Sequence, residues 1–274
     1  MFSSSAYAHT AAFPREQAIG RFAPTKTQKW IIEFIRRFGF GNGALRKYGA
    51  RLLELLREGP IDYDYFGLTL RFGSLIDGST RHMLLSPNWS EREERSFIEA
   101  RLPSNGVFFD IGAHTGLYAF FIAGRRPECT VIGVEPVHEH AALLNFNARS
   151  NGLKRVVVEE VALSDREGIS AFNNDTESMV FGSQSVHVRT TTLQRLAIDH
   201  GIETIDCMKI DVEGMEDRIL MPFFRSVARS LWPKALIIEH ACSSHWNEDC
   251  LAFAKANGYR EQTRNRLNAA LVLD

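Results

Sequence analysis

The chain has 274 residues, and 32 Lys and Arg against 33 Asp and Glu give it a formal net charge of −1. With 45% hydrophobic and 24% charged residues, its composition is that of a globular protein rather than a disordered or fibrous one. A near-neutral chain lacks the basic field needed to bind nucleic acid by counterion release, so we expect no nucleic-acid partner. We also expect no membrane insertion and a cytoplasmic location, because no apolar run reaches the roughly 18 residues of a spanning helix and no signal-peptide pattern is visible.

The first hundred residues predict a small helical region with one hairpin. Residues 1–24 are small and polar, and predict a loose arm. Apolar residues at helical spacing predict amphipathic helices over 25–38 and 44–57. Residues 63–72 predict a short hairpin or a pair of edge strands. Ser90-x-x-Glu93 is a capping-box pattern for a helix through about Leu102. The first helix is predicted to place five apolar residues on one face: Trp30, Ile31, Phe34, Ile35 and Phe38.

From Val107 onward, short apolar runs alternate with helical stretches, which is typical of repeated β-α units around a parallel sheet. The predicted strands are 107–111, 131–134, 156–163, 205–210 and 236–238, and the predicted helices are 116–123, 139–150, 193–200 and 249–257. Residues 166–192 are rich in Asn, Ser, Thr and Gly, and predict a long insertion with some strand. The sequence therefore predicts an N-terminal region, residues 1–104, and an α/β domain, residues 105–274.

The first strong motif runs from Val107 to Gly116, where a buried strand enters a glycine-containing turn and then a helix. The N–H groups of such a turn and helix start face whatever binds there. Asp110 is unusual at the end of an apolar central strand, and Glu135 follows the next strand. In a doubly wound sheet both carboxylates lie at the carboxyl edge, near the switch point. Glu135 is then placed to accept hydrogen bonds from two ribose hydroxyls, and Asp110 to face a cationic group.

The glycine spacing distinguishes two kinds of cofactor. A dinucleotide site uses G-x-G-x-x-G, so that the main chain approaches a pyrophosphate. Here Gly112 and Gly116 are separated by three residues, and His114 stands where the second glycine would be. This favours a ligand without a pyrophosphate, and S-adenosylmethionine is the candidate. In the structural alternative, the glycines only permit a tight turn and the two acids are solvated.

Later acids extend the predicted site. Asp165 follows the third run, where it either accepts the adenine amino group or is a turn residue before Gly168. Lys209 and Asp211 share a strand face by period-two alternation; they are either catalytic or a buried ion pair. Glu239 and His240 end the following run in the same way. A carboxylate-rich edge suits a cationic sulfonium cofactor and can deprotonate a hydroxyl.

Together these motifs resemble the FkbM family of S-adenosylmethionine-dependent methyltransferases over about residues 90–274. The resemblance rests on DIGAHTG at 110–116, VEP at 134–136, LNFNARSN at 144–151, ALSD at 162–165, TTLQRL at 191–196 and KIDVEGME at 209–216. It implies a class I methyltransferase fold, a Rossmann-like doubly wound sheet of seven strands that ends in an antiparallel hairpin. It also implies O-methylation of a hydroxyl on a sugar, polyketide or related metabolite. His114 departs from the asparagine more common in the family, and Gln194 from an aspartate.

The chemistry predicted is in-line methyl transfer to a hydroxyl oxygen. We expect Asp211 to be the general base, with His240 as second choice, and Lys209 to hold the base ionised or orient the substrate. The predicted cofactor-binding residues are Asp110, Gly112, His114, Gly116, Glu135 and Asp165. A divalent metal held by Asp211 and Glu239 is conceivable, but no ligand spacing demands it, and we predict none.

Two other classes compete with a methyltransferase. A nicotinamide-dependent oxidoreductase is disfavoured by the missing third glycine, and a non-catalytic protein of methyltransferase fold would bind the cofactor without turnover. The expected partner is a small-molecule or glycan substrate. The N-terminal helices and the aromatic segment 63–72 are predicted to cover the site or to form a homodimer contact, with plain core packing as the alternative for Trp30 and Phe34. Residues 170–190 are a second candidate lid.

Overall fold

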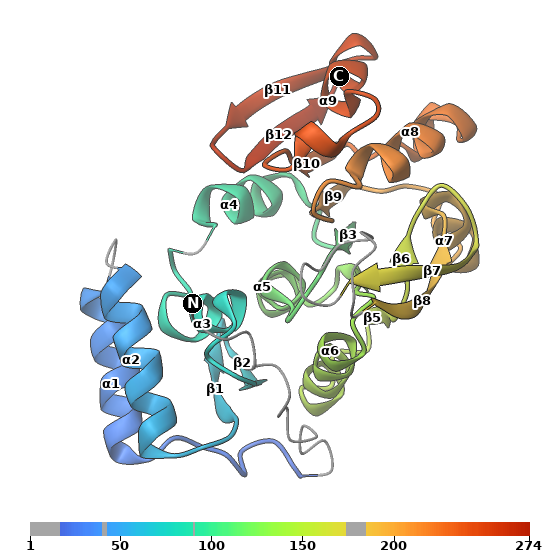
Figure 1. The fold of residues 1–274 in the computed structure, drawn as a ribbon. Helices are drawn as coiled ribbons and strands as arrows, with labels where there is room; N and C mark the ends of the chain where they lie inside the picture. The colour runs from blue at the N-terminus through green and yellow to red at the C-terminus, as the bar shows by residue number, and fades with distance from the viewer. Residues whose placement is uncertain (1–16, 40–42, 90, 174–184) are drawn as a thin grey trace, which may run out of the picture. The chain divides into compact units, whose positions relative to one another are not determined.

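The computed structural model describes residues 17–39, 43–89, 91–173 and 185–274 (Figure 1). The chain divides into two compact units. The first consists of Met1–Asp64 and Thr69–Pro87, and the second of Tyr65–Leu68 and Asn88–Asp274. The boundary expected after residue 104 falls inside the second unit by this division.

The first unit contains two helices, most of a hairpin and a third, short helix. Its elements are α1 (Lys26–Phe38), α2 (Gly43–Leu56), β1 (Ile61–Tyr65), β2 (Leu68–Phe72) and α3 (Gly78–Leu85). The α1 helix starts at a capping box, in which Thr25 Oγ1 accepts from the Gln28 N–H and Gln28 Oε1 accepts from the Thr25 N–H. The sequence predicted both long helices and the hairpin to within about two residues, but it did not predict α3.

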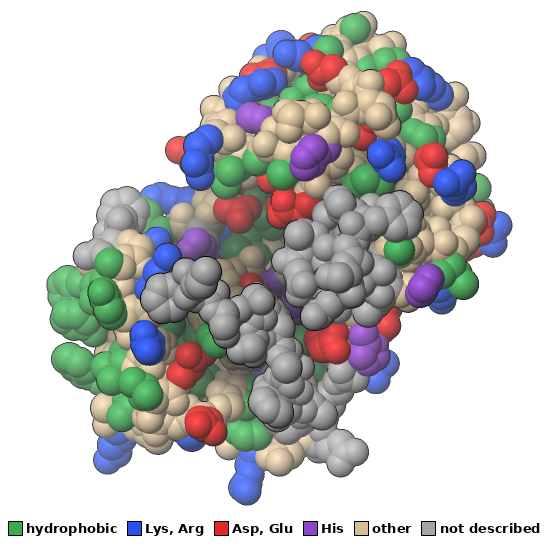
Figure 2. All heavy atoms as spheres, in the orientation of Figure 1, with side chains coloured by type: hydrophobic (Ala, Val, Ile, Leu, Met, Phe, Trp, Pro, Cys, Tyr) green, Lys and Arg blue, Asp and Glu red, His purple; other side chains and the backbone are tan. Residues whose placement is uncertain are grey.

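The face that α1 buries differs from the predicted one. Gln28, Ile31, Ile32 and Ile35 are buried, whereas Trp30 and Phe38 are 64% and 60% exposed and Phe34 is 40% exposed. The three aromatic rings contact one another along the helix: Trp30 stacks on Phe34 with centroids 5.3 Å apart, and Phe34 and Phe38 are tilted with centroids 5.0 Å apart. Figure 2 shows hydrophobic side chains, in green, gathered on the surface over α1 and α2. The predicted face was therefore wrong for its aromatic members, and neither Trp30 nor Phe34 is a core residue.

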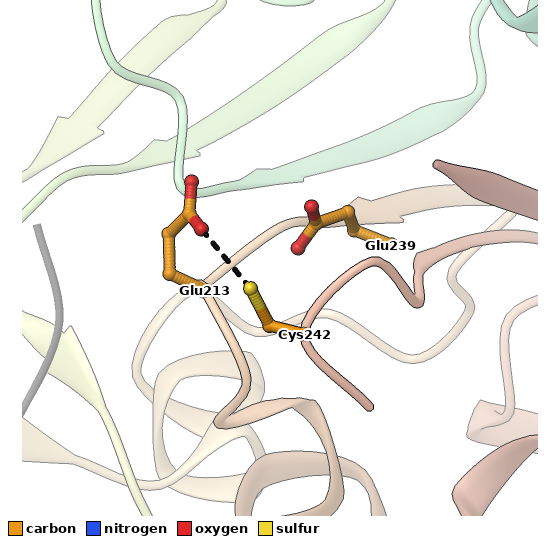
Figure 3. A group of neighbouring side chains, drawn as sticks. All are labelled: Glu213, Glu239 and Cys242. Carbon is orange, nitrogen blue, oxygen red and sulfur yellow. Dashed lines mark hydrogen bonds between the residues drawn. The ribbon is translucent and has the colours of Figure 1, made fainter. Parts of the chain in front are cut away.

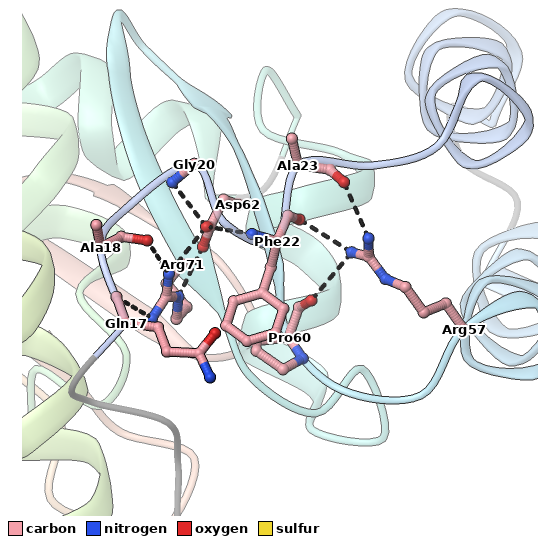
Figure 4. Close-up of polar contacts among 9 residues, drawn as sticks. All are labelled: Gln17, Ala18, Gly20, Phe22, Ala23, Arg57, Pro60, Asp62 and Arg71. Atoms are coloured by element: carbon pink, nitrogen blue, oxygen red, sulfur yellow. Dashed lines mark hydrogen bonds and ion pairs between the residues drawn. The ribbon is translucent and has the colours of Figure 1, made fainter.

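A buried ion pair holds the hairpin to the chain that precedes α1 (Figure 4). Arg71 Nε lies 2.7 Å from Asp62 Oδ1, and both side chains are fully buried. Arg71 also donates to the carbonyl oxygens of Gln17 and Ala18, while Asp62 Oδ2 accepts from the N–H groups of Gly20 and Phe22. The part of the predicted loose arm that the structure describes, from residue 17, is thus anchored.

The second unit carries the remaining elements. Its helices are α4 (Arg92–Arg101), α5 (Leu117–Arg125), α6 (His138–Ser150), α7 (Leu193–Asp199), α8 (Glu216–Ser226), α9 (Cys250–Ala256) and the short 3-10 helices η1 (Arg229–Leu231) and η2 (Ser243–His245). Its strands are β3 (Val107–Ile111), β4 (Thr130–Val134), β5 (Val156–Glu159), β6 (Ala162–Leu163), β7 (Gly168–Asn173), β8 (Ser185–Thr191), β9 (Cys207–Ile210), β10 (Ala235–Glu239), β11 (Tyr259–Arg264) and β12 (Asn268–Leu273).

Seven of these strands form one sheet, in the order β11-β12-β10-β9-β3-β4-β5. The five strands β10, β9, β3, β4 and β5 run parallel to one another. The strand β12 runs antiparallel to both β10 and β11. The chain builds outward from β3 through β4 to β5 and then returns to β9 beside β3, so the switch point lies between β3 and β9. This arrangement confirms the predicted doubly wound seven-stranded sheet and its terminal hairpin.

Alternating side chains of the central strands give the sheet two different faces. Phe109, Ile111, Met208 and Ile210 belong to one large buried cluster with apolar residues of α7, α8 and α9, among them Leu193, Leu220 and Leu251. Asp110 and Lys209 alternate with these residues and pair in register across β3 and β9. Two charged residues therefore lie side by side in the middle of the sheet, on the face opposite its main apolar core.

Two predictions in this unit need correction. The run 156–163 is not one strand, because β5 ends at Glu159 and β6 joins β7 and β8 in a separate three-stranded sheet; Glu159 and Glu160 instead contact His200 and His138. The helix expected from a capping box at Ser90 starts at Arg92, after Glu91 in the left-handed region. Residues 174–184 of the candidate lid 170–190 lie outside the described residues, and so does Ser90. Within the described chain, no helix is long and apolar enough to span a bilayer.

Candidate active site

The loop after β3 is folded tightly against the ends of its two neighbouring strands. The N–H groups of Gly112 and Ala113 both donate to the carbonyl oxygen of Val134, at 3.0 Å. Gly112, His114 and Gly116 have φ angles of 76°, 49° and 92°, in the left-handed region. Glycine adopts this region without strain, whereas His114 does not. A Cβ atom on Gly116 would lie 2.5 Å from the Leu144 side chain, so this position also requires glycine for space.

Asp110 bonds the start of the helix that follows the loop. Its Oδ2 accepts from the Ala119 N–H at 2.9 Å, which satisfies one of the free N–H groups at the first turn of α5. Its Oδ1 is buried and has no hydrogen-bond partner among the described residues. Burial raises the pKa of Asp110 to about 7, although the Lys209 ammonium and the Ala119 N–H oppose this shift. Asp110 therefore has one buried oxygen available for a cationic or hydrogen-donating ligand.

Glu135 links the loop after β3 to the start of α6. Its Oε2 accepts from the His114 N–H and its Oε1 from the Val137 N–H, both at 2.8 Å. The His140 ring nitrogen Nδ1 lies 3.7 Å from Oε1, and the His140 and His114 rings are 3.9 Å apart between centroids. Each carboxylate oxygen of Glu135 keeps a second lone pair. The residue thus fixes the loop and can still accept hydrogen bonds from a ligand.

Lys209 and Asp211 form an ion pair at the end of β9, with Nζ 2.7 Å from Oδ2. The Lys209 side chain is 6% exposed and that of Asp211 is 30% exposed. Burial lowers the pKa of Lys209, but the carboxylates around it, led by Asp211, outweigh burial and raise it above its usual value. The predicted pairing is confirmed, and both interpretations of it, base with positioning residue or structural ion pair, fit this contact.

A third group of acids follows β9 and β10 (Figure 3). Glu239 ends β10, Glu213 lies in the loop after β9, and Cys242 lies in the loop after β10. Burial, together with the neighbouring carboxylates of Asp211 and Glu213, raises the pKa of Glu239 to about 9. The carboxylates that follow β9 therefore disfavour ionisation of Glu239.

Two predicted site residues have different neighbours. His240 Nε2 lies 3.2 Å from the Asn265 carbonyl oxygen, and the His240 N–H donates to Leu267, both in the turn between β11 and β12. His240 also lines a polar pocket of about 310 Å³ with Ser243, Trp246, Asp249, Leu251, Ala252, Lys255 and Arg264. Asp165 follows β6, in the three-stranded sheet, and its carboxylate is half exposed near Ser164 and Arg166. Among the described residues, contacts place Asp110, Lys209 and Asp211 in one group. His240 and Asp165 are not part of this group.

Sequence reasoning missed the groups that surround Lys209 on its other side. The Lys209 ammonium lies 5.1 Å from the centre of the Tyr118 ring, and the Tyr118 hydroxyl donates to Glu91. Burial raises the pKa of Tyr118 well above its usual value, and Glu91 adds to the shift. Glu91 stands in the left-handed region with φ of 45°. Nothing in the sequence connects Glu91 with a tyrosine 27 residues later, so only the fold reveals this contact.

Solved structures resemble the chain only distantly. M. jannaschii TYW2 in complex with AdoMet has a TM-score of 0.41 and 14% identity, covering 80% of this chain and 88% of that one. Precorrin-6y C5,15-methyltransferase from Geobacter metallireducens GS-15 also has a TM-score of 0.41, with 12% identity over 67% of this chain and 87% of that one. M. capricolum TrmK in complex with S-adenosyl-homocysteine has a TM-score of 0.38 and 9% identity, covering 65% and 66%.

The sequence itself matches a family. No curated relative matches the chain significantly. Residues 110–261, more than half of the chain, match the methyltransferase FkbM domain. This segment starts at Asp110, at the end of β3, and runs to Glu261 in β11, so it contains the loop, the acids and the switch point described above. The chain therefore belongs to the FkbM family of S-adenosylmethionine-dependent methyltransferases, as its motifs predicted.

Proposed function

We propose that this chain transfers a methyl group from S-adenosylmethionine to a hydroxyl oxygen of a sugar, polyketide or related metabolite. The observation that carries the proposal is the unpartnered, buried Oδ1 of Asp110 beside a loop in which three residues have positive φ angles. A buried carboxylate oxygen of this kind needs a donor or a cation. The ammonium group of the methionine part of the cofactor provides both.

The other cofactor contacts follow from the loop and from the acid after β4. Glu135 has lone pairs left for the ribose hydroxyls, and the left-handed turn at Gly112, His114 and Gly116 brings main chain close to the ligand. The contact of His114 with His140 places an imidazole pair beside Glu135. Asp165 remains our proposed partner of the adenine amino group, to be tested by substitution because its carboxylate is half exposed.

The residues of this chain supply the acceptor chemistry. The cofactor, when bound, supplies an electrophilic methyl group on a sulfonium. A neutral alcohol is a poor nucleophile, so removal of its proton during attack accelerates the transfer. Asp211 is the proposed base, because its carboxylate is partly exposed while its partner Lys209 is buried. Lys209 keeps Asp211 ionised and fixes its orientation. His240 is the second choice, since its ring is bound to the β11–β12 turn.

The acceptor class is inferred from charge and from family. A formal net charge of −1 disfavours a nucleic-acid acceptor, and family membership disfavours the nicotinamide oxidoreductase considered from sequence. We therefore propose a small-molecule or glycan acceptor. A homodimer contact through the N-terminal helices stays a prediction.

One experiment in two steps tests this function. Thermal shift with S-adenosylmethionine and with NAD identifies the cofactor, because a ligand that binds the native state raises its melting temperature. Transfer of a radiolabelled methyl group to a panel of glycans and hydroxylated metabolites then identifies the acceptor. We expect a shift with S-adenosylmethionine alone and base-stable label on a hydroxyl. Label on nitrogen or carbon would contradict O-methylation, and binding without transfer to any acceptor would favour the non-catalytic alternative.

A further inference from the structure

The group formed by Glu213, Glu239 and Cys242 is not needed for the chemistry proposed above. One carboxylate oxygen from each acid and the Cys242 sulfur all lie within 4.8 Å of one another. Cys242 Sγ is 3.5 Å from Glu213 Oε2. Figure 3 shows the Glu239 carboxylate directed toward the other two side chains. Glu239 ends β10, and Glu213 and Cys242 lie in the loops that follow the adjacent parallel strands β9 and β10.

Glu239 provides an independent sign that a ligand belongs here. The residue is only 8% exposed, and its Oε2 is buried without a hydrogen-bond partner among the described residues. Leaving a buried carboxylate oxygen unpaired costs free energy. Two further carboxylates, those of Asp211 and Glu213, act on Glu239. Such crowding of acids disfavours ionisation of all of them, and a bound cation reverses this effect.

The two loops are held in place by contacts that do not use the three side chains. The Trp246 indole N–H donates to Glu216 Oε2 at 2.7 Å, and the Asn247 N–H donates to Asp217 Oδ2 at 2.7 Å. Gly214 has φ of 95°, and a Cβ atom there would lie 3.1 Å from the Cys242 carbonyl oxygen. The loops therefore stay packed when a side chain of the group is changed, which makes the group suitable for substitution.

We propose that Glu213, Glu239 and Cys242 bind one divalent cation of the zinc class. A thiolate with two carboxylates suits an ion of intermediate softness better than Mg²⁺ or Ca²⁺, which prefer oxygen ligands alone. Zinc bonds of about 2.0–2.3 Å place tetrahedral donors roughly 3.3–3.7 Å apart, so the present donors need to approach by about 1 Å. Three protein ligands leave the fourth position open, as in catalytic rather than structural zinc sites.

The open fourth position of the bound ion is also a place where the acceptor can bind during methyl transfer, an inference that rests on the proposed function. Asp211 is two residues from Glu213 in the chain, and its charge acts on Glu239. A hydroxyl of the acceptor that occupied the fourth position would have its pKa lowered by the ion. Metal binding itself does not rest on the function, because it is measured without cofactor or acceptor.

The test uses the full chain, stripped with chelator, and titrates Co²⁺ by absorption and Zn²⁺ by calorimetry. We expect one Co²⁺ per chain, with a near-ultraviolet thiolate-to-cobalt band. Cys242→Ser should abolish the band, and both Cys242→Ser and Glu239→Gln should weaken Zn²⁺ binding at least about tenfold. The controls Cys129→Ser and Glu203→Gln, which change a buried thiol and an exposed acid elsewhere, should leave the Zn²⁺ affinity within about twofold of that of the unsubstituted chain.

Some results of these titrations would contradict the proposed metal site. Absence of the cobalt band in the unsubstituted chain, or a band that persists in Cys242→Ser, would overturn the proposed site. Equal Zn²⁺ affinity in Glu239→Gln and Glu203→Gln would do the same. Melting temperatures in chelator report whether each variant is folded. Glu239→Gln should melt there no lower than the unsubstituted chain, since it removes an unpaired buried acid. Metal binding without any methyl transfer would refute the proposed function and leave the metal site standing.

Discussion

Gly112 lies directly against the carbonyl oxygen of Asp211: a Cβ atom at position 112 would be 1.8 Å from that oxygen. The Asp211 N–H also donates to the carbonyl oxygen of Ile111 at 3.1 Å. The proposed cofactor loop and the proposed base are thus joined through the ends of β3 and β9. A change in the main chain of the loop therefore moves the main chain at Asp211, whereas a change in the Asp211 side chain alone leaves these contacts in place.

The first prediction concerns Gly112→Ala. Gly112 has a φ of 76°, which strains any other residue. The added Cβ atom also meets the main chain of Asp211, which cannot move without displacing β9. We expect loss of measurable S-adenosylmethionine binding and a lower melting temperature. Gly152→Ala is the matched control, because Gly152 also has a positive φ, 66°, but has open space around it. In this control, the only loss should come from placing alanine in the left-handed region, about 1–2 kcal/mol in the free energy of unfolding. Equal effects of the two substitutions would contradict the close approach.

The second prediction concerns the pH dependence of cofactor binding. Burial raises the pKa of Asp110 to about 7 in the free chain, from an ordinary value of 3.8. A cationic ligand favours the ionised carboxylate, so binding near or below pH 7 should release a proton, and affinity should rise with pH by at most about tenfold per unit until roughly pH 7. Calorimetry in buffers of different ionisation enthalpy measures this proton.

Asp110→Asn provides the control for that proton. The charged groups that act on Asp110 are Lys209, Glu91 and Asp211, and the charge of Asp110 in turn contributes to the raised pKa of Tyr118. If Asp110 is the titrating group, the Asn variant should bind more weakly and release no proton. Proton release that persists in the variant would assign it to one of these neighbours. The same raised pKa means that Asp110 destabilises the fold as pH rises from about 4 to about 7, and no further above that range.

The third prediction separates catalysis by Asp211 from simple ion pairing. Asp211→Asn should lower kcat by about 10²–10⁴ while changing cofactor affinity little. It should also lower the melting temperature, because it leaves the buried Lys209 without its 2.7 Å partner. Adding Lys209→Met to Asp211→Asn should restore stability but not kcat. Recovery of kcat in this double variant would show that Asp211 serves only to neutralise Lys209.

The fourth prediction concerns the first unit. Arg71→Leu leaves Asp62 buried without its ion-pair partner, and breaking a buried pair in this way costs about 3–5 kcal/mol in the free energy of unfolding. Arg225→Leu breaks an exposed pair with Glu248, and should change the free energy of unfolding far less, because solvent and salt screen exposed ion pairs. Urea denaturation followed by tryptophan fluorescence compares the two. A small effect of Arg71→Leu would mean that residues 17–23 are not anchored through Asp62.

The sequence predicted the elements around the sheet well, for a physical reason. Central parallel strands such as β3 are apolar on both faces, and each is followed by a helix, so their positions are evident from composition and periodicity. Asp110, Lys209 and Asp211 were predicted as site residues because charges are rare in such strands. The structure brings them together as register pairs and an ion pair.

Other features depend on tertiary contacts that periodicity does not encode. Apolar spacing in α1 fits two faces, and only packing decides that Ile32 is buried while Trp30 is exposed. Glu91 reaches Tyr118 from the start of α4, and the capping-box pattern at Ser90 does not predict this contact. The spatial grouping of Glu213 with Cys242 depends on how the loops after β9 and β10 fold over one another, and the sequence separates these residues by 29 positions.

Calorimetric titration of S-adenosylmethionine into the full chain, beside Gly112→Ala and Gly152→Ala, tests the central claim most directly. The loop after β3 is predicted to bind one cofactor per chain, with binding lost in Gly112→Ala and retained in Gly152→Ala. Absence of binding to the unsubstituted chain, or undiminished binding in Gly112→Ala, would contradict the claim that this loop is the cofactor site.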